Sequence, residues 1–110
     1  MQKLLLATQR AKMITNHTKR DLDCKPVVKL FCPWGGATWL LSELDPTDDV
    51  AFGLCDLGMG SPELGYVSLD EIRSIRGPAG LYIERDKWFT ADKSLAEYAD
   101  EAYDKGRIQA

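Results

Sequence analysis

Four strand-like segments follow one another between residues 26 and 67, with only short turns between them. They span residues 26–32, 37–44, 50–57 and 63–67 and are rich in β-branched, aromatic and leucine side chains. The residues between them are mainly Gly, Pro, Asp and Ser, which are typical of turns. A parallel crossover needs about a dozen residues or more, so such short links require antiparallel neighbours. The sequence therefore predicts an antiparallel meander.

A helix is predicted before these strands. Residues 4–16 carry apolar side chains at helical spacing, with Thr8 as the expected cap. A polar loop is predicted from residue 16 to residue 25, and it holds the single histidine, His17. The apolar face of this helix consists of Leu6, Met13 and Ile14.

Two further helices are predicted after the meander, because the pattern S-x-x-E occurs at residues 68–71 and again at residues 94–97. In such a capping box the serine and the glutamate satisfy backbone N–H groups at the start of a helix. The first helix is expected to stop before Gly77 and the second before Gly106, with a fifth strand over residues 81–85. The apolar positions are Leu69, Ile72 and Ile75 in the first helix, and Leu95, Tyr98, Ala99 and Ala102 in the second.

A single α+β domain over residues 1–110 follows from these elements. The chain is 45% hydrophobic and 28% charged, which suits one globular core and disfavours disorder. We expect a meander sheet of four to five strands, covered on one side by the N-terminal and C-terminal helices, with one short helix after the fourth strand.

The net charge of −3 hides two opposed blocks. Residues 1–30 carry seven bases and two acids, whereas residues 41–70 carry seven acids and no base. Complementary charge of this kind favours specific association. We therefore expect the basic block to meet the acidic block of the same chain, or a partner that is another protein. The sequence leaves the oligomeric state open.

Nucleic-acid binding is the alternative use of the basic block. The bases that would contact phosphates in this case are Arg10, Lys12, Lys19 and Arg20. A pI near 5.1 disfavours this interpretation, because the acidic block repels a polyanion.

A cytoplasmic protein is expected, without a membrane segment, because the longest apolar runs are only a few residues long. The three cysteines are an odd number, which suits reduced thiols. One histidine and no close cysteine pair predict no metal, no cofactor and no catalytic residue.

Candidate binding residues are instead expected on the sheet and just after it. Alternation along the second strand predicts that Glu43 shares a face with Trp39. A metal-dependent hydrolase stays open as an alternative if sheet carboxylates converge. The candidates are Trp39, Glu43, Asp56, Glu63, Tyr66, Glu84, Arg85 and Asp86.

A family resemblance covers nearly the whole chain. Residues 63–72 and 76–86 with Phe89 resemble the family catalogued as domain of unknown function 2958, as do several upstream segments. The upstream segments are residues 27–31, 38–39 and 52–54. Members of this family are typically encoded on bacterial plasmids, integrative elements and phages, and no activity is established for them. The resemblance thus implies an accessory factor of a mobile genetic element, and we expect it to be non-enzymatic and to bind another protein.

Overall fold

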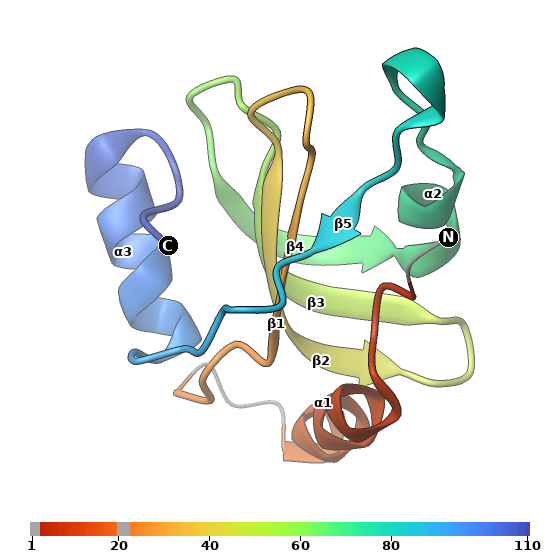
Figure 1. The fold of residues 1–110 in the computed structure, drawn as a ribbon. Coiled ribbons are helices and arrows are strands. Elements are labelled where there is room, and N and C mark those ends of the chain that lie inside the picture. Colours follow the sequence, from red (N-terminus) through yellow and green to blue (C-terminus); the bar gives the residue numbers. More distant parts are fainter. Residues whose placement is uncertain (1–2, 20–22) are drawn as a thin grey trace.

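The computed structural model describes residues 3–19 and 23–110, and it shows an α+β fold with a five-stranded sheet (Figure 1). The predicted fold class is confirmed. In chain order the elements are α1 (Ala7–Lys19), β1 (Val28–Phe31), β2 (Thr38–Asp45), β3 (Val50–Asp56), β4 (Glu63–Ser68), α2 (Leu69–Ser74), the 3-10 helix η1 (Pro78–Gly80), β5 (Glu84–Arg85) and α3 (Leu95–Lys105).

The sheet has the order β4-β3-β2-β1-β5, and every neighbouring pair is antiparallel. The meander from β1 to β4 is as predicted. The fifth strand is shorter than expected and lies at the far edge of the sheet, beside β1, where Leu30 is opposite Arg85 and Phe31 is opposite Glu84. The chain therefore crosses from the β4 edge of the sheet to the opposite edge before it forms β5, so β5 does not continue the meander.

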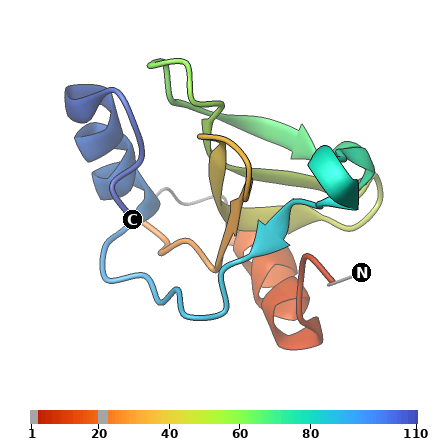
Figure 2. The same cartoon turned by 45° about the horizontal axis from the view of Figure 1, so that its top comes forward.

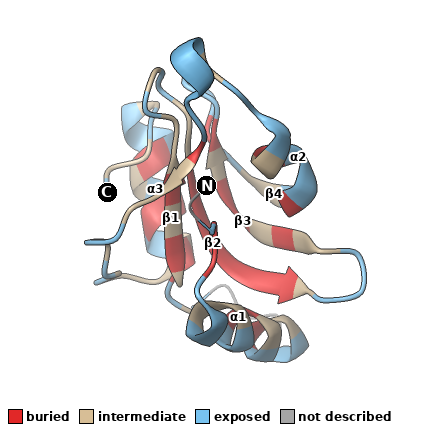
Figure 3. Cartoon of the chain, turned by 45° about the vertical axis from the view of Figure 1, so that its right-hand side comes forward, coloured by how far each residue is buried: buried red, intermediate tan, exposed pale blue. Residues whose placement is uncertain are grey.

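The helices cover both faces of the sheet, so the expectation that the two terminal helices share one side is wrong. On one face, α1 packs against β2 and α2 against β4; on the other, α3 packs against β3 and β4 (Figures 1 and 2). Adjacent side chains of a strand point to opposite faces, so Leu40 lies on the α3 side and Leu41 on the α1 side. Both are fully buried, and Figure 3 shows β2 as the most continuously buried strand.

A β-bulge at Ser42 interrupts the alternation of β2. The register with β3 shifts between Leu41, which is opposite Gly53, and Glu43, which is opposite Phe52. Glu43 therefore points to the α3 face with Phe52, and the expectation that it shares a face with Trp39 is wrong. An extra residue in one strand reverses the facing of every side chain that follows it.

The same bulge attaches α1 to the sheet. The side-chain Nδ2 of Asn16 donates a hydrogen bond to the backbone oxygen of Ser42 at 2.9 Å, and both residues are buried. Burying a polar group costs free energy unless it is hydrogen-bonded, and here each group satisfies the other. The polar Asn16 is thus part of the interface between α1 and β2.

Helix α1 begins and ends later than predicted. Leu6 precedes the helix and is 47% exposed, so it does not belong to a buried face. Thr8 lies inside the helix rather than capping it, and Oε1 of Gln9 accepts the N–H of Leu6 at 2.8 Å. Because the helix continues to Lys19, His17 lies in its last turn and not in a loop.

The two later helices start as predicted. The N–H of Glu71 donates to Oγ of Ser68 at 3.3 Å, and the capping box of Ser94 and Glu97 is complete, with bonds of 3.1 and 3.2 Å. Of the apolar positions predicted for them, Ile75 differs: it ends α2 and is 36% exposed. In the part of the chain that the structure describes, no helix has both the length and the apolar character needed to cross a bilayer.

Candidate binding site

Trp39 and Glu43, the two candidates of β2, are buried on opposite faces of the sheet. Trp39 belongs to the core beneath α1 and α2 and is 4% exposed. Glu43 is 5% exposed. Because β1 pairs only with the first half of β2, α1 lies along the open edge of the second half, and Oε1 of Glu43 comes within 3.4 Å of Nδ1 of His17 at this edge. Glu43 is thus engaged within the fold, whereas Trp39 and Tyr66 both line one shallow hollow of about 480 Å³ beside α2.

Asp56 holds the C-terminal part of the chain against the sheet. Its Oδ1 accepts the N–H of Gly58 at 2.8 Å, and its Oδ2 accepts the N–H of Ile108 at 3.0 Å. The residue is 3% exposed, and both carboxylate oxygens are engaged by backbone groups. This explains an acid inside an otherwise apolar strand.

Glu63 and Tyr66 of β4 point to opposite faces of the sheet. Tyr66 is 59% exposed and packs against Phe52 of β3, with ring centroids 4.9 Å apart. Glu63 is opposite Cys55, and the pKa of the Cys55 thiol is raised to about 11 by burial and by the negative charge of Glu63. Tyr66 is thus the most exposed aromatic candidate on the sheet.

The run from Glu84 to Asp86 connects β5 to its neighbours. Oδ2 of Asp86 lies 3.5 Å from Nζ of Lys29, and Oδ1 accepts the N–H of Trp88 at 2.9 Å. The guanidinium of Arg85 donates to the backbone oxygen of Lys3, which ties the N-terminal segment to β5.

The sheet carboxylates on which a hydrolase would depend are separated by the register of the sheet; they are Glu43, Asp56, Glu63 and Glu84. Glu43 is paired with Phe52, four residues before Asp56 along β3, or about 13 Å at about 3.3 Å per residue. Glu63 lies on the face opposite Asp56, since it is paired with Cys55, the residue before Asp56. Asp56 and Glu84 share a row, but three strand spacings separate them, or about 14 Å at about 4.8 Å each. Among the described residues no group of three or more His, Cys, Asp and Glu side chains is placed to hold a metal ion. These acids therefore form no paired-carboxylate centre.

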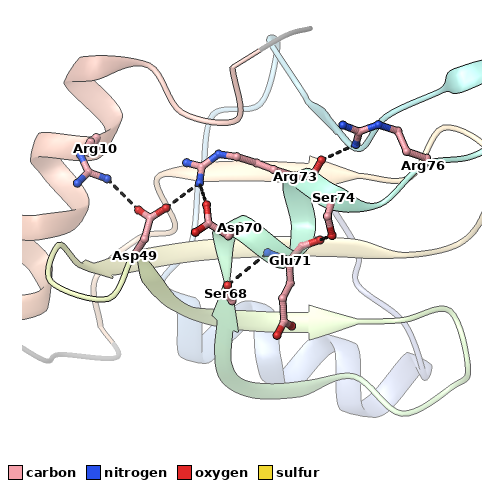
Figure 4. A network of polar contacts seen from close by, with 8 residues as sticks. All are labelled: Arg10, Asp49, Ser68, Asp70, Glu71, Arg73, Ser74 and Arg76. Atoms are coloured by element: carbon pink, nitrogen blue, oxygen red, sulfur yellow. Dashed lines mark hydrogen bonds and ion pairs between the residues drawn. The ribbon is translucent and has the colours of Figure 1, made fainter.

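A different set of charged residues meets where α1, α2 and the turn between β2 and β3 come together (Figure 4). Asp49 of this turn accepts NH1 of Arg10 at 3.1 Å and NH1 of Arg73 at 2.7 Å, and Arg73 also contacts Asp70 at 2.8 Å. Burial alone would raise the pKa of Asp49, but hydrogen bonds and charge from the two arginines outweigh it and lower the pKa. Asp49 thus joins both helices of this face through one carboxylate.

Next to this network lies a cleft of about 430 Å³, which we call the basic cleft. Its lining combines aliphatic side chains with three bases, Lys3, Arg10 and Arg73, and among the described residues it includes no acid. Leu4, Leu5, Ile72 and Ile83 are buried, and they line the cleft together with Lys3, Leu6, Ala7, Arg10, Arg73 and Tyr82.

The mouth of the cleft exposes apolar surface. Leu6 is 47% exposed and Tyr82 is 37% exposed. The guanidinium carbon of Arg76 lies 4.2 Å from the centre of the Tyr82 ring, a cation–π contact that covers one side of the ring. A mostly apolar hollow with a few converging polar groups has the general form of a ligand site.

Most residues of this site were missed by the sequence analysis. Arg10 was considered only for the nucleic-acid alternative, together with Lys12, Lys19 and Arg20. In the structure Arg10 bonds Asp49, and Lys12 and Lys19 line a separate hollow. Arg20 lies outside the described residues. The contact of Arg10 with Asp49 joins the basic and acidic blocks within one chain.

The family of the chain follows from comparison with known proteins. No curated protein and no solved structure matches the chain. The family model described as a protein of unknown function (DUF2958) matches residues 4–109, nearly the full length, and the chain therefore belongs to this family.

Proposed function

We propose that the protein is a non-enzymatic accessory factor of a bacterial mobile genetic element and that it acts by binding another protein. The genetic setting is inferred from the family, whose members are typically encoded on such elements. The binding role is supported by one observation above the others, the basic cleft with its exposed apolar mouth.

Three features favour a protein as the partner. Leucine and isoleucine side chains form much of the cleft lining, and apolar contact of this kind is typical of the central part of protein interfaces. Arginine and tyrosine are among the residues that contribute most to such interfaces. The chain as a whole is acidic, which opposes non-specific binding to nucleic acid.

Affinity capture from cells that carry the mobile element tests this proposal. The wild-type protein is compared with a cleft variant, Lys3→Glu with Leu6→Ser, which changes two exposed residues of the lining. The matched control is Tyr103→Ser with Lys105→Glu on α3. It likewise replaces one exposed hydrophobic residue and one exposed lysine, but on the other side of the sheet.

We expect at least one protein to be captured by the wild type and by the control, and to be reduced about tenfold or more with the cleft variant. Capture of the same proteins in equal amounts by all three would contradict a binding role for the cleft. Capture that depends on nucleic acid, and is lost after nuclease treatment, would favour the nucleic-acid alternative instead.

A further inference from the structure

We infer that the segment bound in the basic cleft carries a carboxylate next to aliphatic side chains, an inference that rests on the proposed function and names the chemistry of the partner. Two properties of the lining support it. Its charged side chains are all positive among the described residues, and the remainder of its surface is largely aliphatic.

The charge of the cleft is opposite to that of the whole chain. Lys3, Arg10 and Arg73 line it, with no acid among the described lining residues. Asp49 and Asp70 bind the two arginines from outside this lining and offset two of the three positive charges, which leaves a net positive charge in a protein whose own net charge is −3. A cationic hollow in an acidic protein attracts anionic groups and repels basic ones, so the charge selects among partners as well as steering them.

Asp49 shows how these arginines hold a carboxylate. One of its oxygens accepts from Arg10 and the other from Arg73, at 3.1 and 2.7 Å. A guanidinium has five N–H donors, and each of these two bonds uses NH1. Asp49 fixes both arginines, and NH1 of Arg73 also donates to Asp70 at 2.8 Å. Each guanidinium has further N–H groups besides NH1, and the Arg10 side chain is 41% exposed. A carboxylate of the partner would bind these donors, with Nζ of Lys3 as a third positive group.

The aliphatic part of the partner is inferred from the cleft walls. Buried Leu4, Leu5, Ile72 and Ile83 line the interior, and exposed Leu6 lies at the mouth. About 430 Å³ is within the usual range of small binding sites and holds a few side chains rather than a whole element. Covering this surface with aliphatic side chains removes apolar area from water.

A nucleic-acid strand fits these walls less well. Proteins hold single-stranded nucleic acid largely by stacking its bases on aromatic side chains. Among the described residues that line the cleft, Tyr82 is the one aromatic side chain, and Arg76 already covers one side of its ring. The lining therefore favours a peptide segment over a polyanion.

Selection from a display library of random ten-residue peptides tests the inference even while the partner is unidentified. Peptides are selected on the wild-type protein, and those that also bind the Lys3→Glu, Leu6→Ser variant are removed. We expect the remaining peptides to be enriched in Asp or Glu within a few positions of Leu, Ile, Val or Met. Enrichment of basic or purely aromatic peptides, or no enrichment that depends on the cleft, would overturn the inference.

The strongest selected peptide is then measured by fluorescence anisotropy, with single-stranded oligo(dT) of equal length as the polyanion control. Replacing its acids with Asn or Gln, or changing the protein with Lys3→Glu, is expected to weaken binding about tenfold, whereas Lys105→Glu on α3 leaves it unchanged. Tighter binding of oligo(dT) than of the peptide would also overturn the inference.

The two proposals fail separately. If capture from cells depends on the cleft but the selected peptides lack acids, the protein-binding role stands and the proposed chemistry of the partner is wrong. If acidic peptides bind the cleft but capture from cells does not depend on it, the cellular role is wrong.

Discussion

Asp56 at the end of β3 accepts the backbone N–H of Ile108 at 3.0 Å, a contact between residues 52 positions apart. The same carboxylate also fixes the turn after β3 through the N–H of Gly58. One buried side chain thus holds both the segment after α3 and the β3–β4 turn in place. Because that segment directly follows α3, Asp56 also helps to keep α3 packed on the sheet.

Asp56→Asn should destabilise the protein by about 1–3 kcal/mol in the free energy of unfolding, because the amide keeps the shape but turns one acceptor into a donor that faces an N–H. Urea unfolding measures the change, and the amide of Ile108 should exchange its hydrogen faster. The control, Asp48→Asn in the exposed turn, should change stability by about 0.5 kcal/mol or less. An equal effect of both variants would refute the structural role of Asp56.

The bridge of Asp49 to Arg10 and Arg73 should make stability depend on acidic pH. Its pKa in the folded protein is lower than the ordinary value of 3.8, so its contribution is complete above that value and is lost as the pH falls through the lower folded pKa. Asp49→Asn suits the backbone, since Asn tolerates the positive φ of 55° at this position. Because the bridge is partly exposed, we expect a loss of about 1 kcal/mol at pH 7 that shrinks below pH 4. Thermal unfolding at a series of pH values measures it, and a loss that is constant down to pH 2 would argue against the bridge.

The thiol of Cys55 should react slowly with alkylating reagents. A pKa of about 11, compared with the ordinary 9.0, lowers the thiolate fraction at pH 8 about a hundredfold, and the thiolate is the reactive form. Alkylation by iodoacetamide at pH 8, followed site by site by mass spectrometry, should therefore be slow for Cys55 in the folded protein and at least tenfold faster in urea. Glu63→Gln should speed it in the folded protein, because a negative neighbour is removed. Equal rates in the folded and unfolded chain would contradict the raised pKa.

Gly53 and Gly65 are direct neighbours on β3 and β4, yet they should respond differently to the same substitution. A Cβ at Gly53 would lie 2.0 Å from the backbone oxygen of Leu40, which cannot move without breaking the sheet, whereas a Cβ at Gly65 meets nothing within 4 Å. Gly53→Ala should therefore destabilise the protein by about 3 kcal/mol or prevent folding, while Gly65→Ala should be neutral or slightly stabilising. Circular dichroism and urea unfolding of both variants decide this. Similar stability of the two would refute the close approach.

The local elements of the fold could be predicted from the sequence because each depends on neighbouring residues. The capping boxes at Ser68 and Ser94, the turns between the strands and the stop at Gly106 all rest on contacts within a few positions. The sides of the sheet that the helices cover could not be predicted in this way. Leu40 and Leu41 are both apolar and both buried, so the pattern of β2 does not say which helix covers which face.

The candidate site was harder to predict because its residues are distant in the sequence. Arg10 and Arg73 meet through Asp49, which lies 39 positions from the first and 24 from the second. A turn aspartate usually bonds its local backbone, and nothing in the sequence marks this one as different. Glu43 was assigned to the wrong face for a related reason, since a bulge leaves no regular pattern.

The bulge at Ser42 has a consequence for changes in chain length. Removing Ser42 would leave Leu41 opposite Gly53 and Glu43 opposite Phe52, so β2 could lose one residue at its centre while every cross-strand pair with β3 is kept. A deletion elsewhere in β2 would turn buried leucines toward the wrong layer. The shortened strand would lose the hydrogen bond from Asn16 to the backbone oxygen of Ser42. The extra residue thus anchors α1 and is not needed to pair β2 with β3.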